Sequence, residues 1–171
     1  LNAFFLNCLC RNLDNLNLLC AVPLDILEAS STRNPEYRQV FATAIHRYWN
    51  DEDGIPKLLI EAMEKTDPDK YDLVCPEWTL HLDVPQIQLF AQAVSHDADF
   101  GTTMETALNV HKAYWSKDAK DEDNRPMDPD GFLAINLLGL AAMAYDRDLS
   151  LEIDSEYLPM YLVDGSFLRS A

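Results

Sequence analysis

The sequence predicts an all-α protein. Apolar residues recur at helical spacing along nearly the whole chain, and period-two alternation is almost absent outside positions 149–153. Several prolines stand where helices would begin, since a first-turn proline needs no hydrogen-bond partner. With 171 residues, 48% hydrophobic and 25% charged, the chain has the length and composition of one globular domain. We therefore expect a single compact domain over residues 1–171, built from roughly seven to nine antiparallel helices.

Small polar residues and prolines mark the ends of the predicted helices. Pro23 ends or kinks the second helix, and Asn34 is the expected cap of the third. Pro85 is expected to open a later helix from its first turn. Apolar stripes between these signals predict helices over residues 1–9, 13–20, 35–49, 56–65, 85–95, 104–115 and 132–145.

The helix expected at 132–145 is apolar almost all round. Asp128 is its predicted cap, Pro129 takes its first position, and Asn136 is its only polar residue. Such a helix is stable only when other helices surround it. It is therefore expected at the centre of the domain. The nearly uncharged run is shorter than the ~20 residues that a membrane-spanning helix requires, so we expect no membrane association.

The charge balance is strongly acidic. Asp and Glu total 29 against 13 Lys and Arg, a formal net charge of -16. A surface of this sign repels a phosphate backbone, so direct binding of nucleic acid is not expected. It would speed the approach of a basic protein partner. The alternative is that acidity serves only solubility.

The cysteines and the start of the chain bear on the cellular compartment. Cys8, Cys10, Cys20 and Cys75 form no C-x-x-C pair and have mostly apolar neighbours. This pattern is typical of reduced thiols packed as small hydrophobic residues in a cytoplasmic protein, so neither a disulfide nor a zinc site is predicted. The chain starts at Leu1 without a signal peptide, and we expect the natural protein to extend further upstream.

The best candidate for catalysis is the pair His96 and Asp97. All-α metal-dependent phosphohydrolases combine a His-Asp pair with a further His, here His46 or His81, and a distant Asp, here Asp146. The competing interpretation is a surface turn, because the pair follows the apolar stripe of a helix where that helix ends. No Gly-rich phosphate loop or nucleophile motif is present, and no cofactor is expected.

Two predicted helix ends share a pattern of His, a basic residue, Tyr-Trp and then acids. The first is 46–53 and the second is 111–123, and a duplication would place both acidic loops on one edge. Tryptophans pack in cores more often than they bind ligands, but one at a helix end beside acids can anchor an interface. The predicted partner-binding residues are Trp49, Asp51, Glu52, Asp53, Tyr114, Trp115, Asp118, Asp121, Glu122 and Asp123.

Several blocks of sequence together resemble the bacterial immunity protein family numbered forty-nine. The most specific are 111–115, 128–134 and 144–147 with Leu158-Pro159, because their order and separation fit as well as their residues. Further blocks are 18–25, 48–49 and 64–68. Asn136 departs from the family's small and apolar pattern. The resemblance implies neutralisation of a toxin in the cytoplasm of the producing cell and does not identify the toxin.

These observations lead to a first hypothesis of a non-catalytic immunity protein that binds a cognate toxin, expected to be basic. Two alternatives remain open. The first is a metal-dependent phosphohydrolase that uses His96 and Asp97. The second is a helical scaffold or regulatory module with a cellular partner. The oligomeric state does not follow from the sequence.

Overall fold

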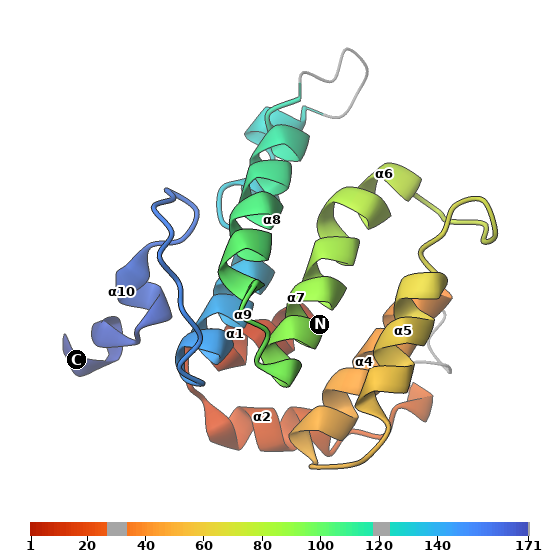
Figure 1. The fold of residues 1–171 in the computed structure, drawn as a ribbon, viewed down its shortest axis with the longest axis horizontal. Coiled ribbons are helices and arrows are strands. Elements are labelled where there is room, and N and C mark those ends of the chain that lie inside the picture. The colour runs from red at the N-terminus through yellow and green to blue at the C-terminus, as the bar shows by residue number, and fades with distance from the viewer. Residues whose placement is uncertain (27–33, 118–123, 171) are drawn as a thin grey trace.

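Helices and turns make up the secondary structure of the described residues, 1–26, 34–117 and 124–170, in a computed structural model (Figure 1). No strand occurs among them, which confirms the all-α class, and their helices fall within the predicted number. The elements are α1 (Asn2–Leu9), α2 (Leu13–Cys20), α4 (Glu36–Trp49), α5 (Ile55–Glu64), α6 (Pro76–Trp78), η1 (Thr79–Asp83), α7 (Val84–Ser95), α8 (Phe100–Trp115), η2 (Arg125–Met127), η3 (Pro129–Gly131), α9 (Ile135–Tyr145), α10 (Met160–Val163) and η4 (Ser166–Ser170).

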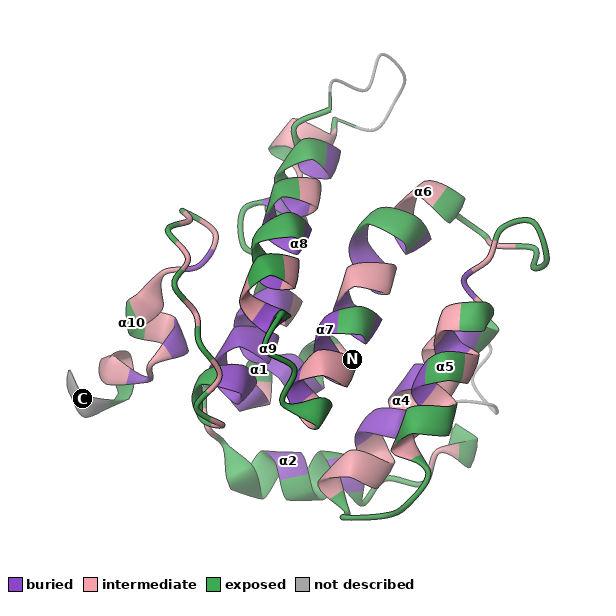
Figure 2. Ribbon diagram, viewed as in Figure 1, coloured by how far each residue is buried: buried purple, intermediate pink, exposed green. Residues whose placement is uncertain are grey.

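Helix α9 lies at the centre of the hydrophobic core, as predicted. Every residue from Leu137 to Ala144 is buried, and α1, α7, α8 and α10 all contact the helix. Buried positions on the surrounding helices face inward, while exposed positions cover their outer sides (Figure 2). A helix with so little polar surface requires this surrounding layer, because its apolar side chains would otherwise face water.

Helices α1 and α9 approach each other very closely in the core. A Cβ built on Gly139 would lie 2.3 Å from the backbone oxygen of Phe5, so only glycine permits this approach. One turn earlier on both helices, Asn136 Nδ2 donates a hydrogen bond of 2.9 Å to Asn2 Oδ1. The two helices therefore run in the same direction. Helices α4 and α5, joined by a short loop, instead pack as antiparallel neighbours (Figure 1).

The central helix begins later than predicted. It starts at Ile135 rather than at 132, because Asp128 and Pro129 initiate the 3-10 turn η3. The Asp128 carboxylate accepts a hydrogen bond of 3.0 Å from the backbone N–H of Asp130, and the chain then turns again before α9. As a result Phe132 is 61% exposed, although it was expected inside the core.

The helix expected to start at Pro85 in fact begins at Pro76 and continues to Ser95 through the π-helical turn η1. Proline has no N–H and its ring crowds the carbonyl one turn earlier, so it disturbs the regular α-helical bonding. Here the N–H of Val84 donates to the carbonyl of Thr79, five residues back. The wider turn brings Asp83 to a buried position.

The two helix ends with the shared Tyr-Trp pattern lie far apart. The C-terminal end of α4 and that of α8 lie at opposite ends of the molecule (Figure 1). The two helix ends that precede the acidic segments therefore do not share an edge, and residues 118–123 of the second segment lie outside the described residues.

Two further expectations concern the cysteines and the membrane. Cys8 and Cys20 are buried as expected, whereas Cys10 and Cys75 are exposed, and all are free thiols. Among the described residues, no helix is long and apolar enough to cross a lipid bilayer.

Replacing Gly139 by Ala tests the α1–α9 contact. Alanine favours a helix over glycine by about 1 kcal/mol, so the change would be stabilising without the contact. Because the new Cβ would meet the Phe5 backbone, we expect a net loss of about 2 kcal/mol in the free energy of unfolding, measured by urea denaturation. Equal or higher stability of Gly139→Ala would show that α1 does not pack this closely on α9.

Candidate functional site

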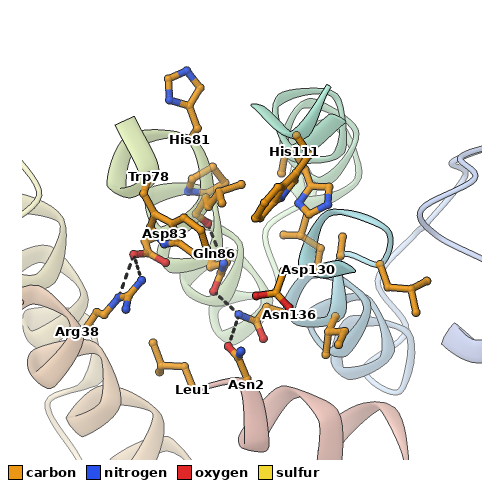
Figure 3. A pocket seen from close by; sticks show the side chains of 18 of the residues that line it. Leu1, Asn2, Arg38, Trp78, His81, Asp83, Gln86, His111, Asp130 and Asn136 are labelled. Atoms are coloured by element: carbon orange, nitrogen blue, oxygen red, sulfur yellow. Dashed lines mark hydrogen bonds and ion pairs between the residues drawn. The ribbon is translucent and has the colours of Figure 1, made fainter. Parts of the chain in front are cut away.

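A pocket of about 530 Å³ opens at one end of the core (Figure 3). Its walls come from the start of α1, from α4, from the continuous helix 76–95, from α8 and from the segment 129–137. Sequence segments far apart thus meet around one concavity, and its size is typical of ligand-binding sites. We take this pocket as the candidate functional site.

A buried carboxylate, that of Asp83, stands on one wall. Its Oδ2 accepts hydrogen bonds from Tyr37 Oη at 2.7 Å and from Arg38 Nε and Nη2 at 3.0 and 2.7 Å. Tyr37 Oη also lies 3.0 Å from Thr79 Oγ1. Burial, together with the neighbouring carboxylate, raises the pKa of Tyr37 to about 12, so the phenol stays neutral and can donate. The Arg38 charge is thus satisfied within the protein.

A chain of side-chain amides forms the floor. Asn136 Nδ2 donates to both Asn2 Oδ1 and Gln86 Oε1, the latter at 3.0 Å, and Gln86 Nε2 donates to the carbonyl of Leu82 at 2.8 Å. This explains the polar residue in the otherwise apolar α9: it connects α9 to α1 and to α7. Asn136 Oδ1 is buried and has no hydrogen-bond donor.

The opposite wall is aromatic. Trp78 packs edge-on against both Tyr114 and Trp115, with ring centroids 5.9 and 5.7 Å apart. Trp115 also lies directly against Gly131, where a Cβ would be 2.8 Å from the indole. The indole N–H groups of Trp78 and Trp115 are buried without an acceptor. Each buried donor of this kind lacks a bond that a bound molecule would supply.

The pocket also contains His111, which lies on the buried face of α8. Its Nε2 is 3.3 Å from the carbonyl oxygen of Gly131, and its ring packs against that of Tyr157. Burial lowers the pKa of His111, so the imidazole favours its neutral form. These contacts give His111 a packing role on the buried face of α8.

Glu77, at the start of the helix 76–95, connects the aromatic wall through ion pairs to the segments that follow α8. Its carboxylate pairs with Lys117 Nζ at 2.7 Å and with Arg125 Nη2 at 2.9 Å. The Arg125 guanidinium in turn lies 4.2 Å from the centre of the Tyr114 ring. Hydrogen bonds from these two basic side chains lower the pKa of Glu77 to about 2.

The predicted partner-binding residues do not gather in one place. Tyr114 and Trp115 are each only 6% exposed: Trp115 lines the pocket, and Tyr114 packs against Trp78. Their burial follows from packing with Trp78 and Leu82, which a helical stripe alone does not reveal. Trp49 is half-buried at the end of α4, and its Nε1 donates a hydrogen bond of 2.8 Å to Asn17.

The acidic residues of this set fall in two groups. Asp51, Glu52 and Asp53 are exposed in the connection between α4 and α5, at the opposite end of the molecule from the C-terminus of α8. Glu52 makes only a long contact with Arg47, at 3.9 Å. The second group, Asp118, Asp121, Glu122 and Asp123, lies outside the described residues.

The structure places His96 and Asp97 in an exposed turn. His96 ends α7 in a left-handed conformation with φ of 54°, and the Asp97 carboxylate accepts a hydrogen bond from the backbone N–H of Asp99. His96 Nε2 is 2.7 Å from Arg147 Nη2, and Asp146 pairs with Arg11. The described residues contain no group of three or more His, Cys, Asp or Glu side chains suited to hold a metal. This arrangement matches the surface-turn interpretation.

Sequence reasoning missed most of this site. Asp83, Arg38 and Gln86 lie on separate helices, and no motif connects them. Two features of the sequence could have indicated this pocket. One is Asn136, the single polar residue of an apolar helix, and the other is Pro85, two residues after Asp83. A lone polar residue on a buried helix must find a partner, so it marks a position where polar groups from other helices converge.

The fold and the pocket define an acidic, all-α protein with a concave, polar-lined surface suited to binding. The chain belongs to the Immunity protein 49 family, whose family model matches residues 1–162. This confirms the resemblance found in the sequence. No curated protein and no solved structure matches the chain.

Changing Glu77 to Gln tests the ion pairs that Glu77 forms beside the aromatic wall. The pKa of Glu77 is lower in the folded protein than its ordinary value of 4.5. The charged carboxylate therefore stabilises the fold above pH 4.5, and this stabilisation is lost as the pH falls toward 2. We expect Glu77→Gln to be less stable than the wild type at pH 7, with a difference that narrows below pH 4.5, measured by urea denaturation. Glu105→Gln, on the exposed side of α8, is the control. A difference independent of pH would contradict the ion pair.

Proposed function

We propose that this protein is a non-catalytic immunity protein that binds a cognate bacterial toxin and thereby protects the producing cell from within its cytoplasm. The family match over residues 1–162 carries this proposal. The acidic composition supports a basic toxin as the partner, since opposite charges accelerate the encounter of two proteins.

In this proposal the exposed acids act at long range. Asp51, Glu52 and Asp53 are free to face a partner, and the acids at 118–123 are proposed to do the same. Such charges raise the association rate but add little to a close-packed interface. Slow dissociation requires buried, well-packed contacts. The half-buried Trp49 is a candidate for such a contact at the α4 end.

Catalysis by His96 and Asp97 receives no support from their surroundings. Their described neighbours are a backbone N–H and an arginine, neither of which holds a metal or activates water. A helical scaffold with a cellular partner would share the fold but would have no toxin gene beside its own. Genomic neighbourhood therefore separates that alternative from the proposal.

Co-expression tests the proposed function. The toxin encoded beside this gene should arrest growth when produced alone, and co-production of this protein should restore growth. The two proteins should then co-purify as a stable complex. Restored growth without a complex, or a toxin that stays active in the presence of this protein, would overturn the proposal.

Charge reversal tests the steering role of the loop between α4 and α5. We expect the double variant Glu52→Lys, Asp53→Lys to slow association with the toxin severalfold at 50 mM salt, with the difference shrinking at 500 mM, measured by stopped-flow fluorescence. Asp69→Lys, Asp72→Lys carries the same charge change near the other end of α5 and is the matched control. Equal association rates for the two double variants would remove this loop from the encounter surface.

A further inference from the structure

The pocket contains polar groups that the protein itself leaves unsatisfied. The Asp130 carboxylate is exposed at the mouth (Figure 3), and no cation among the described residues pairs with it. Asn136 Oδ1 is a second acceptor without a donor, and the indole N–H of Trp115, a residue only 6% exposed, lacks an acceptor. Because those two atoms are buried, the acceptor that the site offers to a ligand is the Asp130 carboxylate, and aromatic rings line one wall.

The charges around the pocket favour a cation over an anion. Arg38 is the one arginine or lysine among the described lining residues, which also include His81 and His111, and Asp83 holds the Arg38 guanidinium in a two-nitrogen contact. His111 favours its neutral form. The unpaired charge facing the pocket is therefore the negative charge of Asp130.

The lining also suits a long side chain attached to a peptide. Trp78 and Trp115 present aromatic surface to a cation. Leu133 and Ile135 are 49% and 39% exposed at the mouth and would cover an apolar stem. The volume of about 530 Å³ leaves room for more than one side chain.

We propose that this pocket is the docking site for a basic side chain, most suitably arginine, carried on a surface segment of the partner protein. This inference rests on the proposed function and names the chemistry of the contact. A guanidinium has several donors and no acceptor, so it matches the exposed Asp130 carboxylate. Arginine is also among the residues enriched at energetically dominant contacts of interfaces.

A titration without any toxin tests the pocket alone. N-acetyl-arginine N-methylamide is added to isotopically labelled protein, and the indole N–H signals of Trp49, Trp78 and Trp115 are followed by NMR. We expect the signals of Trp78 and Trp115 to shift while that of Trp49 does not. The citrulline analogue, a neutral molecule of nearly the same shape, should bind about five- to tenfold more weakly.

Asp130→Asn should weaken arginine binding by a similar factor, whereas Asp154→Asn, an exposed change outside the pocket, should not. The Asp130 side chain makes no contact that the fold requires, so the variant should keep a native spectrum. Absence of shifts, equal binding of arginine and citrulline, or an unchanged Asp130→Asn variant would each overturn the inference. These outcomes leave the co-expression result untouched, so the two proposals fail separately.

Discussion

The contact between Gly139 and the Phe5 backbone is the constraint on which the rest of the structure depends. It lets α1 lie against the central helix without intervening side chains. Because the two helices run in the same direction, it also sets Asn2 beside Asn136, one turn earlier. The apolar contact and the polar floor of the pocket therefore lie on consecutive turns of the same two helices. Movement of α1 away from α9 would disrupt both the apolar contact and the hydrogen bonds of the floor.

Pro85 has a comparable role on the other side of the pocket. By interrupting the α-helical bonding it widens one turn and brings Asp83 to face Tyr37 and Arg38 on α4. Removing a partner from such a buried pair leaves a charge that is costly to keep away from water. The disturbed turn therefore fixes the position of α4 relative to the helix 76–95. This wall of the pocket therefore depends on the π-helical turn and not on regular α-helical packing.

The sequence predicted what depends on local pattern and missed what depends on distant neighbours. The stripe ending at Trp49 and that ending at Trp115 both correspond to helices, because the spacing of apolar residues is a local property. The cap predicted at Asn34 does not form, and Pro35 takes that position without a side-chain hydrogen bond. Phe132 was expected in the core, but the turn fixed by Asp128 directs it outward. The sequence did not reveal that Trp78 and Gly131 pack against Trp115. Neither position can be predicted from a short stretch of consecutive residues.

The acid excess is not explained by the needs of the fold. The ion pairs between described residues each join at least one side chain that is a third or more exposed, and isolated pairs of this kind add little stability. A net charge of -16 also destabilises the compact state through self-repulsion. The proposed function gives such a surface a role, because the acid excess would attract a basic partner at a distance. In that proposal the core would provide the rigidity of the binding surface.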